Sequence, residues 1–410
     1  MNILIVSNYF TPEMGAAANR IRFMADGFSK MGHNVSVICP MPNYPTGKVF
    51  PEFRGRFWMH ESVGDNFDIY RFWIYPDNSR NPVLRLFSML SFGLSLWGIV
   101  FKPRVFARVD WVIVQNSPLL VSFSSVVLFK GIFKKKILLN VSDLWPLSAL
   151  ELGAVKKGLF YSFLEFLEKF NYKNSDLIIG QSEEILEHVS TLCSRPTFLY
   201  RNLQPGGLRA VEATVERVNI CNNYSSRRKI VYAGLLGVAQ GIFDIISNVD
   251  FDSIGLDLHI FGDGYERSKI EIFLQANPSR GVKYHGQIDK VSLDAIIGSY
   301  DASIVPLVRD IKGAVPSKIF ELAQAGVPII FSGEGEGRRL VECLGIGFTA
   351  APRDFGLLRS VLLEFSSISD EKLNALRQRC FDVAKLHFDF NRQLADLDNI
   401  LTGWGGAKYE

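Results

Sequence analysis

The chain has 410 residues, of which 48% are hydrophobic, 12% aromatic and 21% charged, and its formal net charge at pH 7 is +3. This length predicts two domains of about 150 to 200 residues each, and the hydrophobic fraction excludes a generally disordered chain. The five cysteines form no CxxC pair and no Cys/His cluster, which argues against a disulfide framework and a structural zinc site.

The chain opens on the apolar segment NILIVS (2–7). Because the first residues lack a basic n-region and a cleavable apolar core, we interpret this segment as a strand, not as a signal peptide, and expect a cytosolic protein. The following loop, YFTPEMGAAANR (9–20), offers only Gly15 ahead of a helix predicted to run through about Lys30. The absence of GxGxxG argues against a nicotinamide or flavin enzyme. Gly15, Asn19 and Arg20 are candidate ligand-binding residues, with a plain surface charge as the alternative for Arg20.

Residues 80–157 are strongly basic, with eleven lysines and arginines against three acids. Within them, Leu86–Phe101 contains no charge over 16 residues, just short of the 18 or so that a spanning helix needs. Small residues recur there at helical spacing: Ser88, Ser91, Ser95 and Gly98. Bulky apolar residues form the other face: Phe87, Leu90, Leu94 and Trp97.

This segment is either a core helix that packs on a sheet or a helix that lies on a membrane. The flanking bases favour the second interpretation, because basic residues around an apolar patch are attracted to anionic lipid headgroups. We therefore expect peripheral association with the anionic cytoplasmic face of the inner membrane. Nucleic acid is not an expected partner, since an apolar helix interrupts the basic stretch and no recognised binding module is present.

Short apolar segments alternate with helical patterns along the whole chain. In the first half they are NILIVS, NVSVIC, WVIVQ, KILLNVS and DLIIG, and in the second half KIVYAG, LDLHIF, ASIVPL and VPIIF. This alternation predicts an α/β fold with parallel sheets covered by helices on both faces. Residues 204–228 concentrate glycine, asparagine, serine and charge, so we place a domain boundary there, after a first domain of residues 1–203.

In open parallel sheets, ligands bind beyond the carboxyl ends of the strands. In the second half these ends are rich in glycine: AGLLGVAQG (233–241), FGDGYER (261–267) and HGQID (285–289). Because glycine lets the backbone approach a phosphate or a base closely, the second domain is predicted to hold a nucleotide, although such glycines are also common in loops. The candidate residues are Gly234, Gly237, Gln240, Gly262, Gly264 and Ile288.

The segment GAVPSKIFELAQAGVPII (313–330) predicts a helix that begins near Pro316, since proline suits the first helical position. The amides of Ser317 and Lys318, the positive end of the helix dipole and the Lys318 ammonium would converge on a point that suits an anion. Glu321 follows on the same face, where its carboxylate could accept hydrogen bonds from two hydroxyls. A phosphate beside a diol indicates a nucleotide sugar; the alternative is an ordinary capped helix with a surface ion pair.

Taken in order, these motifs resemble those of the retaining glycosyltransferases of family 4, over nearly the whole chain. The segments DLWPLSALELG (143–153) and AVPSKIFE (314–321) look similar to bacterial surface-polysaccharide transferases of WbuB type, such as L-fucosamine transferases. The resemblance implies the GT-B fold, with two facing Rossmann-like domains. It also implies a second domain of residues 204–385 and a C-terminal segment, 386–410, whose helix returns to the first domain.

The same resemblance implies a hexosyltransferase that uses a UDP-sugar, such as one of an N-acetylated deoxyhexosamine like L-FucNAc. The acceptor would be a saccharide on a polyprenyl diphosphate, in O-antigen or capsule synthesis. No metal and no other cofactor is expected. The motifs DFD (250–252) and DLD (396–398) match a DxD pattern only formally, because the first precedes a strand and the second lies in a predicted helix.

Two departures from the family pattern concern the second domain. Many members have a second glutamate eight residues before the position of Glu321, where this chain has Gly313. Many also use an arginine and a lysine where this chain has Leu235 and Gln240. The resemblance therefore implies that Glu321 binds the ribose and that Lys318 carries more of the phosphate charge.

A third departure concerns the first domain. A histidine often ends the strand that here reads LLNVSDLWP, and this chain has Ser142 and Asp143 instead. Asp143 is the candidate for the polar catalytic position, with an N-cap of the following helix as the alternative. Asn202 is a further candidate for the ligand cleft, or an ordinary turn residue.

In the mechanism that we expect, amides near Gly15 and those of Ser317 and Lys318 hold the leaving diphosphate. The acceptor hydroxyl attacks on the face that the phosphate leaves, which gives retention. Two other classes fit the pattern. A UDP-sugar epimerase would release an epimerised nucleotide sugar without an acceptor, and a non-catalytic subunit would bind nucleotide without turnover.

Overall fold

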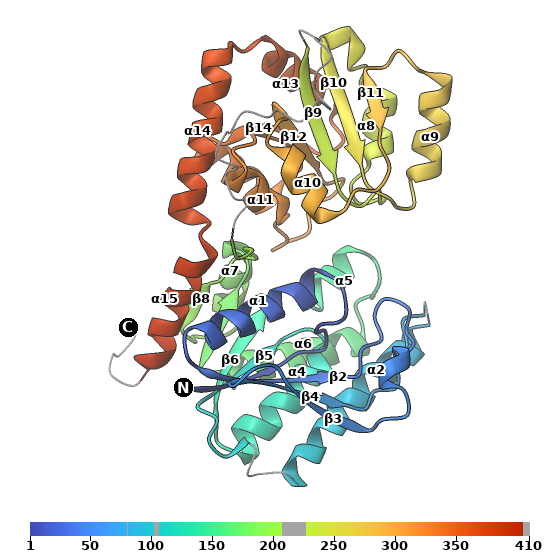
Figure 1. Ribbon diagram of the computed structural model, residues 1–410. Coiled ribbons are helices and arrows are strands. Elements are labelled where there is room, and N and C mark those ends of the chain that lie inside the picture. The colour runs from blue at the N-terminus through green and yellow to red at the C-terminus, as the bar shows by residue number, and fades with distance from the viewer. Residues whose placement is uncertain (80, 102–105, 207–226, 405–410) are drawn as a thin grey trace. The chain divides into compact units, whose positions relative to one another are not determined.

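The computed structural model describes residues 1–79, 81–101, 106–206 and 227–404 (Figure 1). The chain divides into two compact units, Met1–Asn202 with Asn391–Glu410, and Leu203–Phe390. Most of the predicted linker, together with Arg80, Lys102, Arg104 and Cys221, lies outside the described residues. The first domain was predicted to end at residue 203 and the second at residue 385. The first segment of the first unit ends at Asn202, and the second unit ends at Phe390.

The first unit contains an eight-stranded sheet in the order β3-β4-β2-β1-β5-β6-β7-β8. The strands pair in parallel except for the antiparallel pair β3–β4. In chain order the strands are β1 (Asn2–Val6), β2 (Asn34–Pro40), β3 (Trp58–Ser62), β4 (Phe67–Phe72), β5 (Trp111–Gln115), β6 (Lys136–Val141), β7 (Leu177–Gly180) and β8 (Thr197–Leu199).

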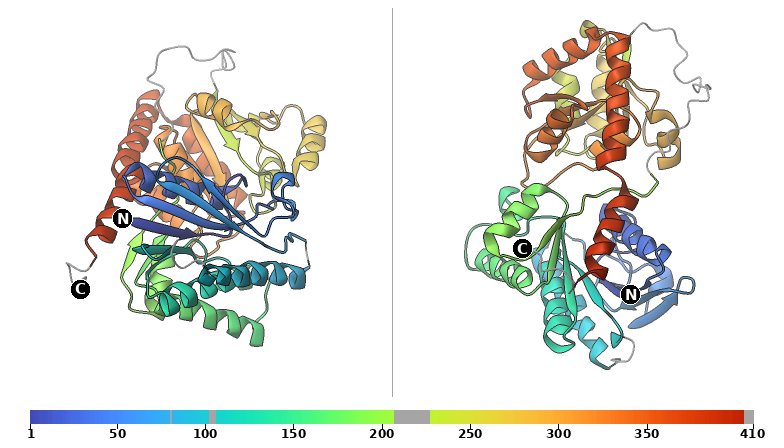
Figure 2. Two further views of the ribbon diagram at one scale, coloured as in Figure 1. Left: turned by 60° about the horizontal axis from the view of Figure 1, so that its bottom comes forward. Right: turned by 90° about the vertical axis from the view of Figure 1, so that its left-hand side faces the viewer.

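Helices flank this sheet, as the views in Figure 2 show. They are α1 (Ala16–Lys30), α2 (Pro82–Ser95), α4 (Leu119–Val126), α5 (Leu147–Glu151), α6 (Leu159–Lys173), α7 (Glu183–Leu192) and α15 (Phe390–Thr402). The last of these packs on the first unit: Asp398 Oδ1 lies 2.8 Å from His33 Nε2, and Trp111 Nε1 donates to Leu401 O at 3.2 Å. The predicted return of the C-terminal helix is therefore confirmed.

The second unit contains a six-stranded parallel sheet in the order β11-β10-β9-β12-β13-β14. Its strands are β9 (Arg228–Ala233), β10 (Leu256–Phe261), β11 (Val282–Tyr284), β12 (Ala302–Pro306), β13 (Ile329–Ser332) and β14 (Gly347–Ala350). Its helices are α8 (Ile242–Asn248), α9 (Arg267–Ala276), α10 (Lys290–Ile297), α11 (Lys318–Gln324), α12 (Gly335–Leu344), α13 (Phe355–Ser367) and α14 (Asp370–His387).

The predicted α/β class and all nine predicted strands are confirmed. The sequence did not reveal β3, β4, β8 and β14 as strands, and of β11 it indicated only the carboxyl end, at HGQID. Strand β3 reads WMHES and its side chains alternate between exposed and half-buried, so it lacks the apolar run of a central strand. Strand β11 has only three residues, too few for a periodic pattern to be recognised.

The apolar segment 86–101 forms most of α2 and a 3-10 helix, Leu96–Phe101. The helix expected across the whole segment therefore ends at Ser95. Residues three apart share a face in a 3-10 helix, and Leu96 and Ile99 are both fully buried. Among the described residues, no helix combines the length and the apolar character that crossing a membrane requires.

The two predicted faces of α2 differ in burial. Helix α2 packs against α4 at Gly93, whose O accepts from Ser124 Oγ at 2.6 Å. Gly93 does not belong to the predicted small-residue face, and Gly98, which does, is exposed. The bulky face is open to solvent, with exposed fractions of 59% for Phe87 and 68% for Leu94. The side chains of this segment that reach the core, Phe92 and Leu96, are also large and apolar. The segment thus buries one apolar face and presents a second one outwards.

The buried ring of His259 in β10 has a lowered pKa. Its Nδ1 lies 3.0 Å from Tyr300 Oη, and its ring centroid lies 4.8 Å from that of His285. Burial, with the nearby charges of His285, Lys283 and Lys229, lowers the pKa of His259 to about 4. The folded unit therefore keeps this ring neutral at pH values where a free histidine takes up a proton.

We predict that the second unit loses stability on acidification in a way that depends on His259. Because the folded pKa is depressed, the unfolded chain binds the proton first, so stability is full above about pH 6.5 and declines as the pH falls towards 4. His259→Asn should remove about 1 to 2 kcal/mol of the stability difference between neutral and acid pH, after allowance for screening. Melting temperatures at pH 7 and about pH 4.5 measure it. The exposed His387→Asn is the control, and equal acid sensitivity of both variants would contradict the assignment.

Candidate functional site

Helix α11 begins with Lys318, and Ser317 is its N-cap residue. Pro316 precedes the helix, so the predicted start is two residues early. The reason is a lead-in of 3-10 type: Ile319 N donates to Pro316 O, and Phe320 N to Ser317 O, each at 3.1 Å. Within the described part of the chain, the amides of Ser317 and Lys318 donate to no other group. They are the free donors that the sequence predicted.

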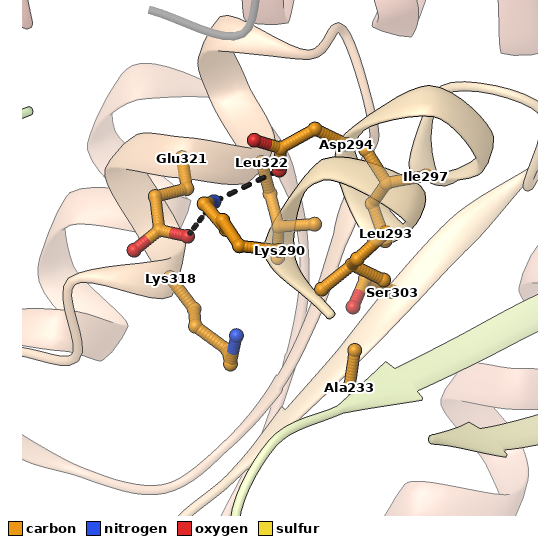
Figure 3. A pocket seen from close by; sticks show the side chains of 9 residues that line it. All are labelled: Ala233, Lys290, Leu293, Asp294, Ile297, Ser303, Lys318, Glu321 and Leu322. Carbon is orange, nitrogen blue, oxygen red and sulfur yellow. Dashed lines mark hydrogen bonds and ion pairs between the residues drawn. The ribbon is translucent and has the colours of Figure 1, made fainter. Parts of the chain in front are cut away.

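Lys318 lines a pocket of about 310 Å³ in the second unit (Figure 3). The pocket is lined by Ala233, Lys290, Leu293, Asp294, Ile297, Ser303, Lys318, Glu321 and Leu322. The Lys318 side chain extends away from the Glu321 carboxylate and, within the described residues, forms no hydrogen bond or ion pair. A Cβ at Gly234 would lie 3.2 Å from Lys318 Cε, so this glycine leaves room for the lysine at the end of β9.

The charge of Lys318 is poorly compensated. Desolvation lowers the pKa of its ammonium group, and the positive charge of Lys290 acts in the same direction. Glu321 and Asp294 oppose the shift, yet the pKa remains below the ordinary value. A cation that is removed from water without a direct partner favours an anionic ligand.

The Glu321 carboxylate is already hydrogen-bonded. It accepts from Lys290 Nζ at 3.1 Å, from Gln204 Nε2 at 3.0 Å and from Ser317 Oγ at 3.3 Å. A diol would therefore join or displace these donors. Lys290 Nζ also lies 2.9 Å from Asp294 Oδ1. The sequence analysis missed Lys290, although it stands two residues after the candidate Ile288 and its i, i+4 spacing to Asp294 was a visible signal of an ion pair.

The glycines after β9 and β10 bring two loops together. Gly234 N donates to Phe261 O at 3.0 Å, and a Cβ at Gly262 would lie 1.8 Å from Gly234 O. A Cβ at Gly264 would lie 2.5 Å from Leu236 O. Both glycines have positive φ, at +147° and +153°. Close packing of neighbouring backbones thus already explains these two glycines, and a ligand contact at them stays a prediction.

Gln240 and Gly237 occupy the loop ahead of α8. Gln240 N donates to Gly237 O at 3.1 Å, and Gln240 Oε1 is buried without a hydrogen-bond partner. A Cβ at Gly237 would lie 2.8 Å from that oxygen. Ile288 is half-buried and directly precedes Asp289, the N-cap of α10. It therefore stands at the start of the helix that supplies Lys290.

In the first unit, Arg20 is buried, so its interpretation as a surface charge is wrong. Its Nη2 donates to Ser142 Oγ at 2.7 Å, and Gln115 Nε2 donates to the same oxygen at 3.0 Å. Burial lowers the pKa of Arg20 to about 10, although Asp143 and Tyr200 act in the opposite direction. Arg20 remains a cation at neutral pH, held at the carboxyl end of β6.

Asp143 follows β6 and does not cap the next helix. Helix α5 begins at Leu147, and its N-cap residue, Pro146, offers no side-chain acceptor. The N-cap interpretation of Asp143 is therefore wrong. Surrounding atoms desolvate the Asp143 carboxyl and raise its pKa, and the Arg20 charge opposes the shift. The side chain nevertheless keeps access to solvent, as a group that orients a substrate hydroxyl or accepts its proton requires.

Gly15 and Asn19 lie on the first turn of α1, which begins and ends as predicted. Gly15 is its N-cap residue, and Asn19 N donates to Gly15 O at 3.0 Å. Both residues are exposed, next to the buried Arg20. Asn202 is half-buried at the end of the first unit.

The described residues contain no group of three or more His, Cys, Asp or Glu side chains that could hold a metal ion. In the two DxD-like motifs, the carboxylates form ion pairs. Asp252 pairs with Arg227 at 2.6 Å and Asp250 with Arg280 at 3.9 Å, and Asp398 pairs with His33.

This architecture is the GT-B fold of glycosyltransferases. Sucrose-phosphate synthase from Thermosynechococcus elongatus superimposes with a TM-score of 0.71 at 15% identity, over 99% of this chain and 100% of that one. The Anabaena protein HepE in complex with UDP gives 0.65 at 13% identity, over 98% of this chain and 100% of its own.

In sequence, the chain is 22% identical to the putative colanic acid biosynthesis glycosyl transferase WcaI of Escherichia coli K12, over 93% of this chain and 100% of the relative. No family model matches the chain. The narrower resemblance to WbuB-type enzymes stays a prediction.

Lys318→Ala should weaken binding of UDP far more than binding of uridine. A hydrogen bond between a charged group and phosphate contributes roughly 1.5 to 3 kcal/mol, which corresponds to a loss of about 10- to 100-fold in affinity. Calorimetric titration of both ligands measures the effect. Lys385→Ala, an exposed position on α14, is the matched control. An unchanged UDP affinity in Lys318→Ala would exclude Lys318 as the phosphate ligand.

Asp143→Asn should keep the melting temperature and the UDP affinity but lose most turnover, by about 10²-fold or more. Asparagine preserves the shape of the side chain and removes the charge that would orient a hydroxyl or stabilise a positive sugar centre. Steady-state kinetics with any accepted donor measure the loss. Near-normal turnover would leave Asp143 without a catalytic role.

Proposed function

We propose that this protein is a retaining glycosyltransferase that moves a sugar from a UDP-sugar to a polyprenyl-diphosphate-linked saccharide in the synthesis of a bacterial surface polysaccharide. The observation that carries the proposal is the desolvated ammonium of Lys318, which has no direct partner among the described residues and lines the same pocket as Glu321 in the second unit. In this assignment, Lys318 and the amide of Ser317 bind the diphosphate.

The chemistry of sugar transfer fits these groups. A nucleotide sugar reacts when negative charge develops on the leaving diphosphate, so a preorganised cation with free amides lowers the barrier more than a protein nucleophile would. The UDP complex of the neighbour HepE supports UDP as the nucleotide.

Glu321 is assigned to the ribose, where the hydroxyls would take over part of its hydrogen bonding from Lys290 and Gln204. Release of Lys290 from Glu321 would leave it paired with Asp294 and close to the bound nucleotide. In the first unit, Asp143 is assigned to the acceptor or to a hydroxyl of the transferred sugar. The charge of Arg20 opposes the rise that desolvation causes in the pKa of that carboxyl.

A surface-polysaccharide role is supported by the relative WcaI, whose name assigns it to colanic acid biosynthesis. An N-acetylated deoxyhexosamine such as L-FucNAc, in O-antigen or capsule synthesis, is the narrower form of the proposal, and it derives from the resemblance to WbuB-type enzymes. The proposal requires no metal.

A lipid-linked acceptor places the enzyme on the cytoplasmic face of the inner membrane, and the surface of the first unit supports this. Helix α4 contacts both α2 and α6. Large apolar side chains of α2, of the 3-10 helix after it and of α6 are exposed: Phe87, Leu90, Leu94, Trp97, Leu159, Phe160, Phe163 and Phe166. Lys156 and Lys157, both exposed, precede α6 directly. Apolar side chains beside lysines suit an anionic lipid surface.

Product analysis tests the activity. The purified protein is incubated with a panel of UDP-sugars and a polyprenyl-diphosphate-linked saccharide, and the products are examined by mass spectrometry and by NMR of the anomeric centre. A glycosylated acceptor with the donor's anomeric configuration supports the proposal. An epimerised nucleotide sugar without acceptor would show an epimerase, and nucleotide binding without any product would show a non-catalytic subunit.

Leu94→Glu should release the protein from anionic membranes, since a carboxylate on the exposed face of α2 opposes burial in lipid. Leu94 suits this test better than Trp97, because Trp97 Nε1 donates to Ser124 Oγ at 2.9 Å and its loss would disturb the α2–α4 contact. Co-sedimentation with vesicles of phosphatidylethanolamine and phosphatidylglycerol measures binding, and high salt should weaken it further. Leu363→Glu, an exposed leucine of α13, is the control. A folded Leu94→Glu variant that still binds vesicles would contradict α2 as the anchor.

A further inference from the structure

A second pocket of the protein lies in the first unit, at the carboxyl ends of β1, β2 and β4, and contains about 420 Å³ of empty space. It is lined by Asn8, Tyr9, Asn43, Tyr44, Ile74, Asp77, Asn78, Ser88 and Met89. The last two residues belong to α2. None of the lining residues was a candidate in the sequence, because they come from four separate loops and helices and form no motif.

The walls of this pocket are fixed by buried hydrogen bonds. The Glu13 carboxylate, buried in the loop after β1, accepts from Asn43 N at 2.7 Å and from Tyr44 N at 2.9 Å. On the opposite side, a Cβ at Gly47 would lie 2.5 Å from Asn78 N, so this glycine permits the close contact of two loops. The pocket is therefore preformed, which limits the entropy lost on binding.

Three oxygen atoms of the lining residues lack a donor among the described residues. Asn8 Oδ1 is buried without any partner. Asn43 binds Met41 O through Nδ2 and leaves Oδ1 without a donor. Asp77 accepts from Ser79 N and Ser79 Oγ through Oδ2 only. Such a set of acceptors favours a ligand that donates several hydrogen bonds.

The charge of the lining excludes an anion as this ligand. The lining residues include the Asp77 carboxylate and no lysine or arginine. The lining of the second-unit pocket, by contrast, contains Lys290 and Lys318 beside Asp294 and Glu321. A phosphate or a uronic acid would meet uncompensated negative charge beside Asp77. The hydroxyl groups of an uncharged polyol can donate to the oxygens of Asn8, Asn43 and Asp77 without adding charge.

We propose that this pocket binds an uncharged saccharide unit, the sugar of the acceptor that receives the transferred residue. The role of this sugar as the acceptor rests on the proposed function. The chemical class of the ligand, an uncharged saccharide, rests on the lining residues alone. The Tyr9 and Tyr44 rings, with centroids 5.7 Å apart and an interplanar angle of 75°, provide apolar ring surface of the kind that packs against the C–H face of a sugar.

The position of the pocket suits a saccharide attached to an apolar carrier. Ser88 and Met89 line the pocket, while the next residues on either side, Phe87 and Leu90, are exposed. A sugar in the pocket would thus lie beside the exposed apolar face of α2.

Binding of simple sugars tests the inference without any donor. Saturation-transfer NMR with the full chain compares methyl glycosides of glucose, galactose, N-acetylglucosamine and N-acetylgalactosamine with methyl glucuronide. We expect at least one neutral glycoside to bind and the glucuronide to bind more weakly. Asp77→Asn should lower the affinity for the neutral glycoside by about tenfold or more, and it should reduce the difference in affinity between the neutral glycoside and the glucuronide. Asn43→Ala should weaken it too, whereas Asp65→Asn, the same change in the exposed turn before β4, should not.

Kinetics separate this inference from the proposed function. If transfer occurs, Asp77→Asn should raise KM for the acceptor and leave the UDP affinity unchanged. If neutral glycosides bind and Asp77→Asn weakens them but no donor is ever transferred, the proposed function fails and the saccharide pocket stands. If no neutral glycoside binds the wild-type chain, or if both pocket variants keep wild-type affinity in a folded protein, the inference is overturned.

Discussion

The second unit desolvates the ammonium group of Lys318, which has no hydrogen bond or ion pair within the described residues, and much of the local structure depends on that arrangement. The absence of a side chain at Gly234 makes room for the lysine beside β9, and the amides of Ser317 and Lys318, at the start of α11, donate to no group in the described part of the chain. Glu321 is held by Lys290, Gln204 and Ser317. An anionic ligand would therefore compensate the desolvation of this cation.

The two units contain pockets of different chemistry. One has two lysines beside two carboxylates in its lining, and the other has a carboxylate and several amides but no lysine or arginine. Each lies near carboxyl ends of parallel strands, where loops converge. A reaction that joins a phosphorylated sugar to a neutral one requires this division, because a cationic acceptor pocket would also bind the donor's phosphates.

The sequence predicted those parts of the molecule in which local pattern determines structure. Apolar runs located nine of the strands in the two sheets, and the spacing of Lys318 and Glu321 located one pocket. Burial could not be predicted in this way. The alternative for Arg20, a surface charge, was wrong because its contacts in the fold, with Ser142 and near Gln115, involve residues much later in the chain. The alternative for Asp143, an N-cap, was wrong because α5 begins only at Leu147. The pocket around Asp77 depends on four segments at once, and Glu13 connects two of them.

The amphipathic character of α2 has a consequence for handling the protein. Phe92 is buried in the core, while Phe87 and Leu94 remain exposed. In water without lipid or detergent, these exposed side chains can be covered only by those of another molecule, because hydrophobic association is not directional. Particle sizes measured without detergent would then reflect self-association through this face. Mild detergent should dissociate such assemblies, and an assembly that resists it would be formed by a different surface of the chain.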